Sequence, residues 1–95
     1  MNNTTKPAPV VGMAVTWIDP SEDENNAHFI ETSLHRGYGR EGLRVHEIRD
    51  NGKIVILERN GQPLMNRLNP DWKTETPREI GEVVAAFSWG YLKPI

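Results

Sequence analysis

The chain has 95 residues, of which 37% are hydrophobic and 25% charged, so it has room for one domain with one core and lacks the composition of a disordered chain. Its formal net charge of −2 excludes the overall basic field that drives sequence-independent binding to nucleic acids. The absence of cysteine excludes disulfides and thiolate metal sites, and we expect a cytoplasmic protein.

Residues 1–9 are predicted to form a flexible arm, because they are mostly polar residues and prolines without apolar periodicity. They contain no apolar stretch of signal-peptide length, and nowhere does the chain have the roughly 18 consecutive apolar residues of a membrane span. We therefore expect a single β-rich domain over residues 10–95, neither exported by a signal peptide nor inserted in a membrane.

The first strand is predicted directly after residue 10, where apolar residues alternate with small or polar ones. Its apolar face consists of Val11, Met13, Val15 and Trp17. Asp19 and Pro20 end this strand, and residues 22–26 form an acidic, solvent-facing loop without the ligand spacing of a calcium loop. Residues 27–32 are predicted to be a short strand. Because an exposed edge there can pair with a second copy, a homo-oligomer is an open alternative.

The clearest pattern is a three-strand meander over residues 43–68, with an Asn-Gly pair at each bend. Asn51-Gly52 and Asn60-Gly61 are preferred pairs for type I′ hairpin turns, since both central positions need a positive φ. A two-residue first turn places Ile48 opposite Val55.

The spacing of apolar residues in the meander predicts two further features. Leu43 and Val45 share a parity that Ile48 does not, so a bulge near His46 or Glu47 is needed if all three face one core. The middle strand is apolar on both faces, which means that something must cover each of them.

One short helix is predicted near residues 77–86. Thr76 is a suitable N-cap, Pro77 occupies the first helical position, and Glu79 lies three residues after the cap. The chain then alternates again over residues 87–91, which predicts a final strand.

Five or six short strands, a long early connection, a tight meander and a last strand able to pair with the first resemble the layout of small SH3-like barrels, which include KOW, Tudor and SH3 modules. The resemblance covers most of residues 10–95, and Tyr91-Leu92-Lys93-Pro94-Ile95 is similar to an SH3 closing strand. It implies a mainly β fold: a small SH3-like barrel, or a strongly curled antiparallel sheet of five to six strands. The chain lacks the paired tryptophans of peptide-binding SH3 domains, so their proline-rich ligands are not implied.

No catalytic or metal-binding constellation is found in the sequence. Residues 37–42 match the pattern GxGxxG, but a strand-like segment follows where a dinucleotide-binding fold needs a helix, so these glycines are expected to serve turns. The histidines His28, His35 and His46 have no ligand-pair spacing, and the serines lack a nucleophile elbow. We therefore expect a non-enzyme with no metal and no cofactor.

The best candidate for a binding site is a basic and aromatic cluster in and beside the glycine loop. Arginines hold phosphates or carboxylates, and an exposed tyrosine stacks on a base or anchors a protein partner. A tryptophan just after a turn is a further candidate anchor, with packing beneath the loop as the alternative. The candidate binding residues are His35, Arg36, Tyr38, Arg40, Arg44 and Trp72. A solvated connection, with arginines paired to Glu41 or Glu47, is the open alternative.

Two functions are consistent with these features. The first is a non-catalytic interaction module, an adaptor or inhibitor that binds a protein partner through the glycine loop and Trp72. The second is an RNA- or DNA-binding module of KOW-like type that uses Arg36, Arg40 and Arg44 with Tyr38. Only the second predicts an affinity that falls steeply with salt.

Overall fold

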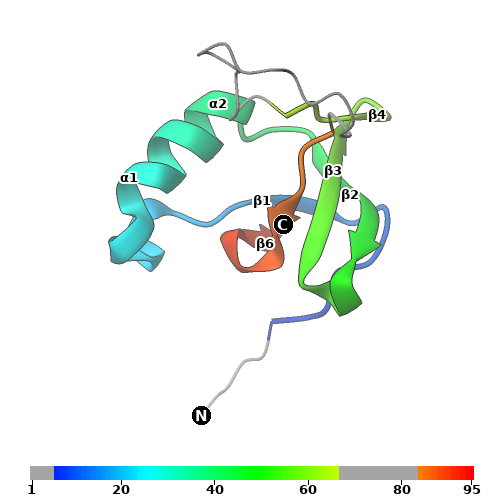
Figure 1. Ribbon diagram of the computed structural model, residues 1–95, viewed down its shortest axis with the longest axis horizontal. Coiled ribbons are helices and arrows are strands. Elements are labelled where there is room, and N and C mark those ends of the chain that lie inside the picture. The colour runs from blue at the N-terminus through cyan, green and yellow to red at the C-terminus, as the bar shows by residue number, and fades with distance from the viewer. Residues whose placement is uncertain (1–5, 67–83) are drawn as a thin grey trace, which may run out of the picture.

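The computed structural model describes residues 6–66 and 84–95, and its fold is a small mixed α/β domain. A helical segment at 24–38 lies beside a six-stranded antiparallel sheet (Figure 1). The strands are β1 (Ala14–Trp17), β2 (Leu43–Arg49), β3 (Ile54–Arg59), β4 (Gln62–Pro63), β5 (Phe87–Ser88) and β6 (Leu92–Pro94). They follow the order β4-β3-β2-β1-β6, and β5 also pairs with β3.

The sheet is open, so the expectation of a closed barrel or a strongly curled sheet is wrong. Its last part reaches β3 through β5 and β1 through β6, but both strands are short and the 3-10 turn η6 (Trp89–Tyr91) separates them. No continuous strand therefore joins β3 to β1. The predicted pairing of a last strand with the first is found in β6, but the predicted strand at 87–91 is wrong in its extent, because only Phe87–Ser88 is a strand there and residues 89–91 form η6.

The meander is confirmed in β2, β3 and β4. At the second turn, Asn60 and Gly61 have φ of 57° and 80°, as a type I′ turn requires, and Arg59 pairs with Gln62 across them. At the first turn the Lys53 N–H donates to the Asp50 carbonyl over 3.0 Å, and positive φ begins one residue before the Asn-Gly pair. The third strand, predicted to reach residue 68, ends at residue 63 within the described part of the chain, and residues 67 and 68 lie outside it.

The bulge is also confirmed. Ile48 pairs with Val55 as expected, and the register then shifts between Val45 and Glu47, which leaves His46 unpaired in the ladder. Val45 is buried and Ile48 packs against the core from its edge, so both face the same core. The extra residue of the bulge allows this despite their opposite parity. The doubly apolar middle strand is covered as well, since three consecutive residues, 55–57, are buried.

The predicted strand at 27–32 is wrong, because this stretch is helical. The segment consists of η2 (Glu24–Asn26), α1 (Ala27–Phe29), the π-helical η3 (Ile30–His35) and α2 (Arg36–Tyr38), preceded by the 3-10 turn η1 (Pro20–Glu22). Ile30, Leu34 and Tyr38 follow one another at a spacing of four and are all buried. That spacing places them on one helical face, and burying this face against the sheet outweighs the weak strand signal of residues 27–32.

The predicted helix at 77–86 falls mostly outside the described residues. Its last three positions are described and are not helical. Val84 forms an isolated bridge with Met65, and the Ala85 N–H donates to the Leu64 carbonyl over 2.9 Å. This end of the predicted helix is therefore an extended segment that leads into β5.

The core lies between the helical segment and one face of the sheet. Its aromatic centre is formed by Trp17, Tyr38 and Phe87, with ring centroids 5.0 Å apart for both pairs that include Phe87. The prediction that Trp17 belongs to the core is confirmed. Within residues 6–66 and 84–95, no helix has the length and apolar character needed to cross a membrane.

Candidate functional site

The glycine loop, residues 39–42, is fixed by an arginine from the meander. Arg59 donates from Nη2 to the Tyr38 carbonyl over 2.6 Å and from Nε to the Glu41 carbonyl over 3.0 Å. Gly39 and Gly42 have positive φ and lie against this side chain, so the glycines make room for it. The interpretation of GxGxxG as turn glycines is confirmed for Gly39 and Gly42, after which β2 follows, but not for Gly37, which lies in α2.

The sequence analysis missed Arg59. A signal for it existed in the register of the meander, because Arg59 pairs with Leu43, the first residue after the glycine loop. A cation opposite that position is within reach of the Tyr38 and Glu41 carbonyls.

Strand β1 holds the same loop from its other side. The Trp17 indole Nε1–H donates to the Gly39 carbonyl over 2.7 Å, and the Thr16 hydroxyl lies 3.4 Å from the Arg40 carbonyl. Contacts from two strands thus define the position of the loop, and with it the position of the Arg40 side chain.

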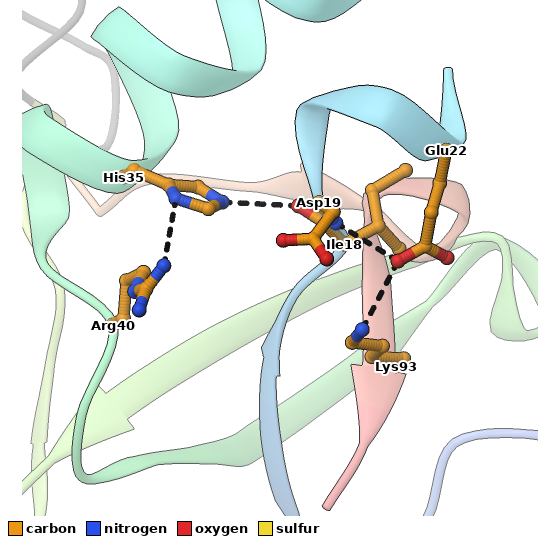
Figure 2. Close-up of polar contacts among 6 residues, drawn as sticks. All are labelled: Ile18, Asp19, Glu22, His35, Arg40 and Lys93. Atoms are coloured by element: carbon orange, nitrogen blue, oxygen red, sulfur yellow. Dashed lines mark hydrogen bonds and ion pairs between the residues drawn. The ribbon is translucent and has the colours of Figure 1, made fainter.

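His35 joins the helical segment to Ile18, which directly follows β1, and to Arg40, as Figure 2 shows. Its Nε2 lies 3.0 Å from the Ile18 carbonyl, which only accepts, so Nε2 carries the proton and donates. Its Nδ1 is then an acceptor, and Arg40 Nη1 donates to it over 3.3 Å. The imidazole therefore orients the guanidinium without neutralising its charge.

A second polar group lies on the other side of Asp19 in Figure 2. Glu22 Oε2 accepts from the Asp19 backbone N–H and from Lys93 Nζ, both over 3.0 Å. These contacts hold the pKa of Glu22 below its usual range, with the backbone hydrogen bond as the larger cause and Lys93 as the second. The ion pair ties β6 to the turn η1.

The loop, β1 and the end of the chain border a surface groove. The groove is lined by Thr16, Trp17, Asp19, Arg40, Glu41, Gly42, Lys93 and Ile95. Thr16 and Lys93 are paired across β1 and β6, so their side chains lie on the sheet face opposite Val15 and the core. Two cations, two carboxylates and an apolar residue with 80% of its surface exposed, Ile95, thus share one concave surface.

The structure brings only part of the predicted cluster together. His35 and Arg40 are in contact, whereas Arg36 lies 3.7 Å from Glu31 in an exposed ion pair on the helix. Tyr38 is buried in the core, with 5% of its surface exposed. The other two predicted residues are Arg44, which donates to the Gly12 carbonyl over 2.8 Å, and Trp72, which lies outside the described residues.

The arginines of this region differ in whether a carboxylate lies beside them. Arg36 and Arg49 each have a carboxylate partner, Glu31 and Glu47 respectively. Among the described residues, neither Arg40 nor Arg44 has a carboxylate within 4.0 Å. Their contacts go to uncharged acceptors, so both retain a charge that can attract an anionic group.

Groups of three or more metal-ligating side chains are absent from the part of the chain that the structure describes. No protein-family model matches the chain, and comparisons with curated proteins and with solved structures find no match. The geometry of the groove is therefore the basis for a functional proposal.

Proposed function

We propose that this domain is a non-catalytic interaction module that binds a protein partner at the groove beside the 39–42 loop. The main support for this proposal is the composition of the groove. The exposed Ile95 lies among two cationic side chains and two carboxylates, which are Arg40, Lys93, Asp19 and Glu41. An apolar residue framed by polar groups of both signs is typical of protein interfaces. A phosphate backbone at the same place would meet carboxylates, which repel it.

The contacts in the groove support a particular partner chemistry. Lys93 is already paired with Glu22, while Arg40 is oriented by His35 and has no carboxylate partner among the described residues. A pre-oriented guanidinium loses less conformational entropy on binding. The partner we propose carries a carboxylate for Arg40 next to an apolar side chain for Ile95.

The alternative function, RNA or DNA binding of KOW-like type, is supported by the charges of Arg40 and Arg44. It is not supported by Tyr38, because the ring packs between Trp17 and Phe87 and offers no free face to a base. The layout resemblance to KOW, Tudor and SH3 modules stays a proposal, supported by the meander and by the pairing of β1 with β6.

The test is capture of partners from cell lysate with an N-terminally tagged chain, since the C-terminal Ile95 lines the groove. Captured proteins are identified, purified and titrated against wild type, Arg40→Glu and Ile95→Asp. We expect both variants to weaken binding by at least about tenfold, since such anchors contribute about 2 kcal/mol or more. Arg49→Glu, at the opposite end of β2 and outside the groove, is the matched charge-reversal control and should bind as wild type does.

Nuclease treatment and salt distinguish the alternative. If capture depends on nucleic acid, and if binding of a labelled RNA or DNA falls steeply with salt and is lost in Arg36→Ala with Arg40→Ala, the protein-partner proposal is rejected. Equal binding of the partner by wild type, Arg40→Glu and Ile95→Asp would reject the groove as the site.

A further inference from the structure

The start of the described chain makes a second contact, with residues that do not line the groove. Residues 6–9 read Lys-Pro-Ala-Pro and pack against Trp89 and the tip of the β2–β3 hairpin, past which they run in Figure 1. Whether residues 1–9 as a whole are flexible stays a prediction. The contacts of residues 6–9 nevertheless define a surface with a specific chemistry.

Trp89 is contacted at three points by two consecutive residues. Its indole Nε1–H donates to the Pro7 carbonyl over 3.1 Å, and its own carbonyl accepts from Lys6 Nζ over 2.6 Å. The same ammonium lies 4.7 Å from the centroid of the indole ring, which is the geometry of a cation–π contact. The Trp89 side chain thus recognises a lysine and the carbonyl of the proline that follows it.

A second proline extends the contact to the hairpin. Pro9 is buried and lies against Gly52, where a Cβ would approach the Pro9 ring to 3.6 Å. Prolines are restricted in φ and lack an N–H, so extended segments that contain them bind aromatic surfaces with a small loss of conformational entropy. Lys6, Pro7 and Pro9 therefore occupy this surface as a short linear motif would.

Glu22 adds a matching charge to the lysine end. Burial lowers the pKa of Lys6, and the nearby carboxylate of Glu22 opposes that effect. The preference for lysine at this position of the motif rests on the geometry at Trp89, whose carbonyl accepts from the ammonium and whose ring lies beneath it.

Residues 6–9 contact the domain as a bound peptide does, and not through the backbone hydrogen bonds of a paired strand. Among the described residues, no backbone-to-backbone hydrogen bond joins residues 6–9 to the rest of the domain. Its anchors are one side-chain ammonium, one carbonyl and one proline ring, so another segment with the same chemistry can replace it.

We propose that the surface formed by Trp89 and Gly52 is a binding site for extended Lys-Pro-x-Pro segments of partner proteins, and that residues 6–9 of the chain occupy it in cis and compete with them. This inference is independent of the groove around Arg40. Because a short tether gives a segment an effective concentration in the millimolar range, the cis segment masks the site from weak ligands.

The test uses the full chain and a fluorescently labelled synthetic peptide that contains Lys-Pro-Ala-Pro. We compare wild type with a variant whose cis segment is disabled, Lys6→Ala with Pro7→Gly and Pro9→Gly. Release of the cis competitor should tighten peptide binding by at least about tenfold. Trp89→Phe in the same background keeps an aromatic ring but removes the indole donor, and it should weaken binding by about tenfold.

Control peptides test the chemistry of recognition. Replacement of the lysine by glutamate, or of both prolines by glycine, should each reduce binding at least about tenfold, since each removes one anchor. Equal binding of wild type and the disabled variant, or equal binding of the control peptides, would overturn the proposal.

Two further measurements distinguish the proposed binding site from a structural role of residues 6–9 and from self-association of the chain. Thermal unfolding of the disabled variant should resemble that of wild type, and a large fall in its midpoint would show that residues 6–9 are a structural part of the domain and would overturn the proposal. Sedimentation should show monomers for both proteins. A concentration-dependent dimer that the disabled variant abolishes would assign the surface to a second copy of this chain instead of a partner.

Discussion

Arg59 Nη2 lies directly beside Gly39, where a Cβ would be only 3.2 Å from that nitrogen. The same guanidinium donates to the adjacent Tyr38 carbonyl over 2.6 Å. One arginine of the meander thereby sets the shape of the loop that borders the groove. The position of Arg40 depends on this contact, although Arg59 itself does not line that groove.

Gly39→Ala should destabilise the domain more than Gly61→Ala does. Both glycines have positive φ, 78° and 80°. Alanine at position 61 incurs a backbone cost of about 1–2 kcal/mol. Gly39 also has ψ of 167°, a conformation open essentially only to glycine, so its backbone cost is about 1–3 kcal/mol. Only at Gly39 does the added methyl also displace Arg59, because no atom lies within 4 Å of a Cβ at Gly61. We expect an extra loss of about 1–2 kcal/mol from the disturbed hydrogen bonds, measured by urea unfolding. Equal losses would show that the contact between Arg59 and the loop contributes nothing.

Phe87→Ala should remove the centre of the aromatic core. Its ring contacts both Trp17 and Tyr38 at centroid distances of 5.0 Å, and the residue is almost fully buried. Deletion of such a ring costs about 3–5 kcal/mol, which is a large part of the stability of a small domain. Val11→Ala, at a position with 60% of its surface exposed, should change the free energy of unfolding by less than about 0.5 kcal/mol. A loss below about 1 kcal/mol for Phe87→Ala would contradict this core.

Glu22→Gln should flatten the acid side of the stability profile. The pKa of Glu22 is lower in the folded chain than its usual value of about 4.5, because the Asp19 N–H and Lys93 both stabilise the carboxylate. Stability from such a group is present above the unfolded pKa and is lost as the pH falls through the folded one. Wild type should therefore be more stable than Glu22→Gln at neutral pH, and the two unfolding curves should converge below about pH 4.5.

The matched control for this pH dependence is Glu24→Gln. Glu24 is also an exposed carboxylate in the same turn region, but no hydrogen bond or ion pair joins its side chain to another described residue. Because Glu24 lacks such contacts, Glu24→Gln should have nearly the same free energy of unfolding as wild type at neutral pH, where Glu22→Gln is less stable. If Glu22→Gln runs parallel to wild type from neutral pH to about pH 3, the contacts of the Glu22 carboxylate with the Asp19 N–H and with Lys93 do not exist in solution.

Asn60→Ala should weaken the second hairpin, whereas Asn60→Gly should not. Asn60 has φ of 57°, a conformation that costs alanine about 1–2 kcal/mol and that glycine adopts freely. We expect a loss of about 1 kcal/mol for alanine in chemical denaturation. Equal stability of the two variants would mean that the turn relaxes to another type.

The meander and its bulge could be predicted because they depend on local rules. Turn residues with positive φ and a change of parity within one strand are visible in the sequence, and Ile48 and Val55 pair as those rules require. The helical segment could not be predicted in the same way, because Phe29 and Ile30 suggested a strand over residues 27–32. The spacing of Ile30, Leu34 and Tyr38 favours a helix instead, but Tyr38 had been interpreted as part of the glycine loop.

Part of the candidate site was equally visible in the sequence. Arg40 and His35 were identified from composition, and their contact follows from the helix that positions His35 above the loop. The burial of Tyr38 and the contribution of Ile95 depend on which face of the sheet the helix covers, which no local pattern encodes. Lys93 was seen only as part of the last strand, because its pairing with Glu22 joins residues far apart in the chain.

The last strand, β6, also determines how the domain behaves at high concentration. Ile95 and Ile18 donate to the carbonyls of Ala14 and Tyr91 across the β1–β6 ladder, so alternate residues, Leu92 and Pro94, direct their backbone groups outward. The Leu92 N–H is taken by the Trp89 carbonyl, and proline has none. At these two residues that border of the sheet offers carbonyls without donors, so addition of a neighbouring strand and growth into fibrils from this side are disfavoured.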